Sequence, residues 1–173
     1  MTASRNATRR EWQPREMQLL TEWLMKNYSH AKWQTRVRLG APHPSLTERA
    51  MTETEERMVG SWRRWADAVI FNGDKVIIVE AAIRPNPGKI SQLQLYDQLF
   101  ATTPEFREHR SKKRELVLLY GVEDLALVTL ARRQGIRCVE YVPEWLPDYL
   151  AILYPRERRA PLAPEFEEEE QEK

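Results

Sequence analysis

The sequence predicts an α/β fold in which helices flank a central sheet. Two apolar runs, residues 66–71 and 75–83, are joined by Asn72-Gly73, the strongest two-residue signal for a β-hairpin. Both faces of these runs are apolar, which is the pattern of central strands that helices cover on each side. Helical and strand-like segments alternate along the remaining chain, as expected for this fold class.

The segments before the hairpin predict one helix and one strand. The helix is expected to begin near Pro14, a residue favoured in the first turn, and to end at about Tyr28. Glu16 falls beside the buried stripe of this helix. Residues Lys32–Leu39 alternate between apolar and polar side chains and predict a strand. The segment 40–60 is expected to be a loop that contains a short helix.

The segments after the hairpin continue the alternation of helices and strands. A break rich in proline and glycine at 84–88 precedes a helix over 89–102. The inner face of this helix holds Leu93 and, one turn earlier, Lys89. The remaining predicted elements are a strand at 116–120, a helix at 123–134 that Gly135 ends, a strand at 137–142 and a helix at 145–154.

The hairpin brings two acidic side chains onto one face. If Asn72 and Gly73 form a two-residue type I′ turn, Asp67 lies opposite Ile78, and Glu80 follows two residues further on, on the same face. Such diagonal neighbours are roughly 6–8 Å apart at Cβ, so the two carboxylates can share one hard divalent cation, which takes oxygen ligands. A three-residue loop would place Glu80 on the opposite face.

A simpler explanation is that the two acids are solvated residues of an edge strand. The apolar residues on both faces of the hairpin argue against it, because they indicate central, buried strands. A buried pair of carboxylates repels and is desolvated unless a cation or a hydrogen-bond donor compensates. The surroundings therefore favour a metal site at Asp67 and Glu80.

Length and composition indicate a globular protein. The chain has 173 residues, of which 42% are apolar and 31% are charged. We therefore expect one domain over 13–157, preceded by a mobile N-terminus at 1–12. No run approaches the ~20 apolar residues of a membrane helix, and the N-terminus lacks the apolar core of a signal peptide. The single Cys138 excludes an internal disulfide, and three scattered histidines argue against a zinc site. We expect a cytoplasmic protein without a membrane partner.

The charge is unevenly distributed along the chain. Residues 165–173 hold six Glu and one Lys, which is −5, so the net charge of +1 leaves +6 on residues 1–164. A mildly basic body with an acidic extension suits a nucleic-acid partner. The acidic tail, expected to be disordered over 158–173, also offers a contact for a protein partner. A tail that only aids solubility explains the composition equally well.

Short motifs lie on the predicted elements in a definite order. Ala66-Asp67 begins the second strand, Glu80-Ala81-Ala82 lies in the third, and Gln92 and Tyr96 form a Q-x-x-x-Y element in the following helix. In this order and spacing they resemble the motifs of the PD-(D/E)XK nuclease superfamily. The Q-x-x-x-Y element is similar to that of its RecB-like branch, which is also Holliday-junction-resolvase-like. The resemblance covers roughly residues 14–142.

The resemblance implies a fold and a further metal ligand. The expected fold is a restriction-endonuclease-like αβββαβ core, with a mixed central sheet flanked by helices. Glu16 is similar to the first-helix Glu that several branches of the superfamily add to their metal site.

One residue departs from the pattern of the superfamily. Ala82 stands where its members have a lysine, which positions the attacking water and stabilises charge on the phosphate. Arg84 lies further along the same strand face, and its long side chain reaches part of the way back. Lys89 lies on the inner face at the start of the next helix, where some members of the superfamily place their lysine. We prefer Lys89, because arginine clamps phosphate but transfers protons poorly.

The first functional hypothesis is a Mg²⁺- or Mn²⁺-dependent nuclease that acts on DNA. Asp67 and Glu80 would hold the metal with help from Glu16, and a bound water would attack the phosphorus. Lys89 or Arg84 would stabilise the developing charge.

Basic residues supply the expected contacts to DNA. Arg63 shares the predicted strand face of Asp67, and the run 107–114 is strongly basic. The same run is as typical of an ordinary solvated loop. The candidate DNA-contacting residues are Arg63, Gln92, Tyr96, Arg110, Lys112 and Lys113.

The alternative hypothesis is a catalytically inactive protein of the same fold that serves as a DNA-binding or structural assembly module. The missing lysine is its main support. The chain also has conspicuous tryptophans that could serve partner contacts, although packing explains each one alone: Trp12, Trp62, Trp65 and Trp145. Catalysis is slightly favoured, because an inactive domain has little reason to retain two facing carboxylates.

Overall fold

The computed structural model describes residues 5–41 and 63–154, with side chains from Pro14 onwards. The chain divides into two compact units, Met1–Pro143 and Glu144–Lys173. The short helix predicted within 40–60 and the acidic tail at 158–173 lie outside the described residues. Within the described part of the chain, no helix is both long enough and apolar enough to cross a membrane.

The first unit is an α/β domain whose elements follow the predicted order. A single helix precedes a strand and a β-hairpin, and further helices then alternate with strands. In chain order the elements are α1 (Arg5–Asn27), β1 (Lys32–Leu39), β2 (Arg64–Asn72), β3 (Lys75–Ala82), α3 (Pro87–Thr102), the 3₁₀ helix η2 (Pro104–His109), β4 (Lys113–Tyr120), α4 (Leu125–Arg133) and β5 (Arg137–Glu140). The second unit contains the helix α5 (Leu146–Leu153).

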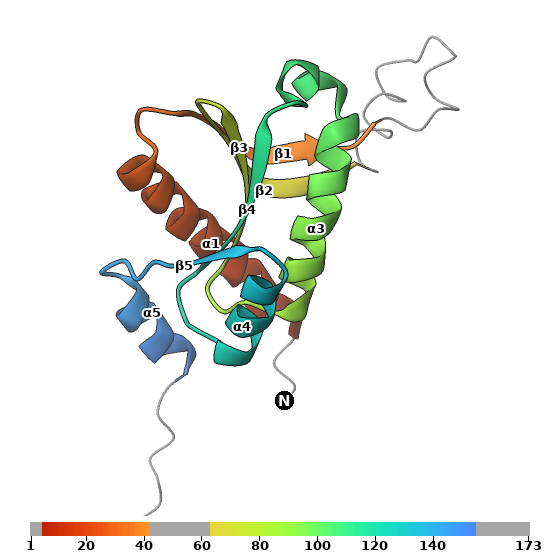
Figure 1. Cartoon of the computed structure of the whole chain (residues 1–173). Helices are drawn as coiled ribbons and strands as arrows, with labels where there is room; N and C mark the ends of the chain where they lie inside the picture. The colour runs from red at the N-terminus through yellow and green to blue at the C-terminus, as the bar shows by residue number, and fades with distance from the viewer. Residues whose placement is uncertain (1–4, 42–62, 155–173) are drawn as a thin grey trace, which may run out of the picture. The chain divides into compact units, whose positions relative to one another are not determined.

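The five strands form one mixed sheet in the order β1-β2-β3-β4-β5. Neighbouring strands β1, β2 and β3 are antiparallel, whereas β3–β4 and β4–β5 are parallel. The tight turn between β2 and β3 makes these two strands antiparallel, whereas the helical crossovers through α3 and α4 make β3–β4 and β4–β5 parallel. Figure 1 shows α1 on one side of the sheet and α3 on the other. The predicted restriction-endonuclease-like arrangement, a mixed sheet flanked by helices, is confirmed.

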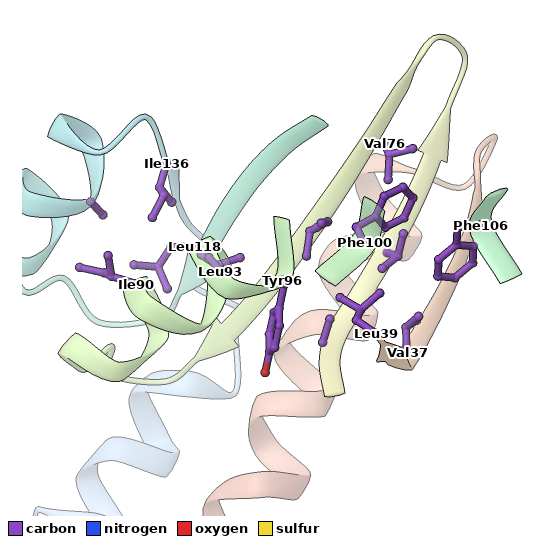
Figure 2. Close-up of a cluster of buried hydrophobic side chains, with 14 of the residues drawn as sticks. Val37, Leu39, Val76, Ile90, Leu93, Tyr96, Phe100, Phe106, Leu118 and Ile136 are labelled. Atoms are coloured by element: carbon purple, nitrogen blue, oxygen red, sulfur yellow. The ribbon is translucent and has the colours of Figure 1, made fainter. Parts of the chain in front are cut away.

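The larger core lies between the sheet and helices α3 and α4 (Figure 2). The inner stripe of α3 is Ile90, Leu93, Tyr96 and Phe100, each almost fully buried. Phe100 stacks on Phe106 of η2 with ring centroids 5.1 Å apart. On the opposite side of the sheet α1 packs against β3 and buries its own stripe, which consists of Leu19, Leu20, Trp23 and Leu24.

The β2–β3 hairpin differs from the prediction in register but not in parity. Its turn is Gly73-Asp74, so Asn72 pairs with Lys75, and every cross-strand pair is displaced by two residues from the expected one. Of the two turn residues only Gly73 has a positive φ, at 60°, which matches a type II′ turn with glycine in first place. Because side chains alternate with a period of two, this displacement keeps Asp67 and Glu80 on one face.

Two other boundaries differ from the sequence predictions. Helix α1 begins at Arg5, so the predicted start near Pro14 is wrong and Pro14 lies inside the helix. A proline in a helix interior removes one backbone hydrogen bond, and helical pairing continues on both sides of it. The predicted basic loop at 107–114 is partly ordered, because η2 extends to His109 and β4 already begins at Lys113.

A buried threonine joins the end of β1 to the end of α3, and its removal tests this packing. The Thr103 hydroxyl accepts a hydrogen bond from the Gly40 amide at 2.9 Å and donates to the Leu99 carbonyl at 2.8 Å. Thr103→Val should lower the free energy of unfolding by about 1–3 kcal/mol, because the buried Gly40 amide loses its partner.

The neighbouring Thr102 is the matched control. Its hydroxyl also donates to Leu99, but the residue is exposed and satisfies no second buried group. Thr102→Val should change the free energy of unfolding by less than about 0.5 kcal/mol. Equal losses in the two variants, measured by urea denaturation, would contradict this account of the junction.

Candidate functional site

The site lies where strands β2 and β3 leave their regular ladder. The paired register runs from Asn72↔Lys75 to Ala68↔Val79. Beyond that point side chains supply the acceptors: the Asp67 amide donates to Glu80 Oε1 at 3.3 Å, and the Ala81 amide donates to Asp67 Oδ2 at 2.9 Å. The two carboxylates therefore replace ladder bonds and are held by the backbone of the opposite strand.

Lys89 lies between these two carboxylates. Its Nζ donates to Glu80 Oε2 at 2.7 Å and to Asp67 Oδ2 at 3.2 Å. The three side chains are largely buried, with exposures of 2% for Glu80, 15% for Lys89 and 29% for Asp67. Lys89 reaches this position from the first turn of α3, which Pro87 opens. The structure thus brings together the three residues that carried the sequence-based site.

Glu16 and Tyr96 border the same group of charges. Glu16 of α1 lines a cavity of about 380 Å³ together with Asp67 and Lys89, and the backbone amide of Ile83 hydrogen-bonds its carboxylate. The ring of Tyr96 lies among the hydrophobic core side chains, and its hydroxyl points away from them (Figure 2). This hydroxyl interacts electrostatically with the carboxylates of Glu80 and Asp67 and with the ammonium of Lys89.

Burial and mutual repulsion perturb the acid–base behaviour of the cluster. Burial, reinforced by the charge of Asp67, raises the pKa of Glu80 to about 8, even though Lys89 opposes the shift. Burial also raises the pKa of Glu16 above its usual value. For Lys89, burial lowers the pKa, but the charges of Glu80 and Asp67 outweigh it, so the pKa rises and the ammonium stays charged. Burial and the same two carboxylates raise the pKa of Tyr96 to about 12, which keeps the phenol neutral.

The cluster is deficient in positive charge. When Glu16, Asp67, Glu80 and Lys89 are all ionised, three carboxylates and one ammonium leave two negative charges. Burial is the main cause of the raised pKa values of Glu16 and Glu80, and the charge of Asp67 adds to both shifts. Oxygen donors with a residual negative charge suit a hard divalent cation. Among the described residues, however, no group of three or more His, Cys, Asp or Glu side chains converges as a complete metal-binding set. Asp67 and Glu80 are the two that meet, and Lys89 shares their oxygens.

The wall of the cavity contains one residue that the sequence did not single out, Arg36. It lines the cavity together with Asp67 and with Trp65, which the sequence offered only as a possible partner contact. Arg36 has a φ of 52°, rare for a residue other than glycine, and the β1–β2 pairs pass from Thr35↔Ala68 to Val37↔Ala66 without pairing Arg36. The alternating pattern of β1 gave no signal for this distortion. Strained backbone of this kind gathers at functional sites.

Several residues predicted to join the site lie elsewhere. Arg84 and Gln92 are exposed and do not line the cavity. Arg63 precedes β2, donates to both carboxylate oxygens of Glu105 and also bonds the Arg38 carbonyl. Arg63 and its partner Glu105 from η2 line a second cavity of about 440 Å³, which Asp67 does not line.

The basic run is also remote from the carboxylates. Lys112 donates to the carbonyl of Gly73 at 2.8 Å, which places it beside the hairpin turn. Lys113 pairs with Lys75 and Leu118 with Glu80, so five residues of strand separate Lys113 from the site, or about 17 Å at the rise of a β-strand. Arg110 is exposed at the same end of the sheet.

Comparison with known proteins adds no relative. No protein-family model matches the chain, and no curated protein sequence matches it.

The raised pKa of Glu80 predicts a stability that depends on pH. The folded pKa of about 8 lies above the ordinary glutamate pKa of 4.5, so the folded state binds the extra proton between these values and stability falls as pH rises through that window. In EDTA, wild type should lose on the order of a few kcal/mol between pH 5 and pH 9. Glu80→Gln cannot titrate and should flatten most of this slope in thermal unfolding.

Glu105→Gln is the control for this measurement. Hydrogen bonding to Arg63 lowers the pKa of Glu105, so its titration lies below the window. That variant should keep the wild-type slope. A Glu80→Gln variant with the same slope as wild type would show that Glu80 is ionised throughout.

Proposed function

We propose that the protein is a metal-dependent nuclease that hydrolyses phosphodiester bonds in DNA, and that it is a PD-(D/E)XK-type enzyme whose lysine comes from the helix after the hairpin. The observation that carries the proposal is the buried Asp67–Glu80–Lys89 cluster at the open end of the hairpin. Its residue types are those of the resemblance, and its place in an αβββαβ core is the same.

Each residue of the cluster has a role in this proposal. Asp67 and Glu80 would hold Mg²⁺ or Mn²⁺, with Glu16 as an additional carboxylate across the cavity. The bound metal would supply a nucleophilic water at neutral pH and polarise the phosphate. Lys89, charged and anchored to both acids, would stabilise negative charge on the phosphate. The first turn of α3 adds backbone amides that favour an anion there.

In this proposal Lys89 takes the place of the lysine that the superfamily carries on the strand, where this chain has Ala82. Ala82 follows Glu80 by two residues on the same strand face, is 1% exposed and carries no charge. Lys89 brings an ammonium to 2.7 Å from Glu80 by a different route, through the turn that enters α3. Arg84, the other candidate substitute, is exposed, so we assign it no part in the reaction.

The second candidate is a catalytically inactive module that binds DNA or assembles with a partner. It is favoured by the ion pairs themselves, because Lys89 already compensates both carboxylates, and by the lack of a complete metal-binding set in the described part of the chain. In that case the cluster would serve to fix the hairpin against α3. Cleavage assays separate the two candidates.

The first test is cleavage of plasmid and single-stranded DNA with Mg²⁺ or Mn²⁺. Wild type should cleave, and Asp67→Asn should abolish cleavage, because it removes a ligand charge while keeping the side-chain shape. Asp74→Asn is the matched control, since Asp74 is exposed in the hairpin turn and far from the cluster; it should cleave like wild type. No cleavage by folded wild type with either metal would exclude the nuclease and leave the module.

The second test moves the lysine. Lys89→Ala should lose about 2–4 kcal/mol of transition-state stabilisation, measured as kcat/KM, while DNA affinity falls far less. Ala82→Lys in the Lys89→Ala background should restore part of the activity, because it returns an ammonium beside Glu80. Lys75→Ala, next to the hairpin turn at the other end of β3, should leave kcat/KM unchanged. Equal losses of activity in Lys75→Ala and Lys89→Ala would contradict the role assigned to Lys89.

A further inference from the structure

An exposed tryptophan stands at the edge of the candidate catalytic cavity. Trp65 lies in β2 two residues before Asp67, and both residues line the same cavity of about 380 Å³. The side chain is 45% exposed, unlike the core residues of the same strand. A large aromatic surface that is left in solvent beside polar groups is a feature of binding sites rather than of packing.

A stacked arginine holds this tryptophan in place. The guanidinium carbon of Arg38 lies 4.6 Å from the centroid of the Trp65 ring, within the range of a cation–π contact. Arg38 and Trp65 are direct cross-strand partners in the β1–β2 register, so the contact is built into the sheet. Arg38 covers part of the indole while much of it stays exposed.

A second arginine lies beside the indole. Arg36 lines the cavity together with Trp65. Arg64, the neighbouring residue of β2, interacts electrostatically with Tyr96 and lies on the other face of the sheet, because successive strand residues point to opposite faces. The acidic cavity is therefore bordered by an exposed aromatic side chain with Arg38 on its ring and by Arg36, which is a combination that binds the backbone and bases of a single strand.

We propose that Trp65, supported by Arg38, is a stacking platform for one unpaired base of a DNA strand whose backbone passes Arg36 to reach the Asp67–Glu80–Lys89 cluster. This inference deepens the proposed function and rests on it, since it states which form of DNA the site takes. The substrate is single-stranded DNA or the unpaired part of a branched or flapped molecule.

The argument for an unpaired base is geometric. In a duplex each base is stacked between its neighbours, so its face is not available to a side chain. The exposed part of Trp65 can stack only on a base that has left the helix or never belonged to one. Stacking of this kind tolerates any base, because each has an aromatic face.

The test measures DNA binding without cleavage. Fluorescence anisotropy in EDTA would compare a labelled oligothymidylate with a labelled blunt-ended duplex at one fixed salt concentration. Wild type should bind the single strand more tightly. Trp65→Ala should weaken single-strand binding by about tenfold to a hundredfold and change duplex binding by less than about twofold. Trp65→Phe, which keeps an aromatic face, should restore most of the single-strand affinity.

Tyr141→Ala is the matched control. Tyr141 also has a cation over its ring, with Lys26 Nζ 5.7 Å from the centroid, but it does not line the cavity. It should bind both DNA forms like wild type. The proposal is overturned if wild type prefers the duplex or binds no single strand, if Trp65→Ala affects both forms equally, or if Tyr141→Ala matches Trp65→Ala.

The assay separates this inference from the proposed function. Loss of single-strand affinity in Trp65→Ala, in a protein that cleaves no DNA with metal, would uphold the platform and reject the nuclease. Cleavage by wild type with unchanged binding in Trp65→Ala would do the reverse.

Discussion

The buried ammonium of Lys89 between two carboxylates is the interaction on which the site depends. An isolated charge costs too much in a protein interior, so each of the three groups is tolerable only because the others are present. The compensation is incomplete, since Glu16 adds a third carboxylate close by. Burial, reinforced by the charge of Asp67, raises the pKa of Glu80 even though Lys89 opposes the shift.

The fold brings these groups together from separate segments. The tight turn at Gly73 fixes the parity that places Asp67 and Glu80 on one face. Strands β3 and β4 are parallel, and the crossover between them contains α3. The first turn of α3 therefore lies next to the end of β3. At this point the carboxylates accept hydrogen bonds from opposite backbones. The strand ends thus carry acidic side chains in place of the regular ladder, and the cavity opens beside them.

Much of the fold and of the candidate site could be predicted from the sequence. The physical reasons for this success also explain which predictions failed. Asp67 and Glu80 share a face in both the predicted and the observed register, because the two differ by two residues and side chains alternate with that period. The contacts of Arg63 were not predictable from local pattern, since its partner Glu105 is 42 residues away and belongs to another element. The positive φ of Arg36 has no sequence signal, because arginine rarely adopts that conformation.

The nuclease proposal requires the carboxylates of Asp67 and Glu80 to bind one divalent cation. A calorimetric titration of the metal-free protein with Mn²⁺ measures this binding directly. We expect one saturable site per chain, with a dissociation constant in the millimolar to sub-millimolar range. Binding to this site should disappear in the double variant Asp67→Asn/Glu80→Gln and persist in Glu105→Gln. Equal heats in wild type and the double variant would contradict it, because the two carboxylates would then bind nothing beyond Lys89.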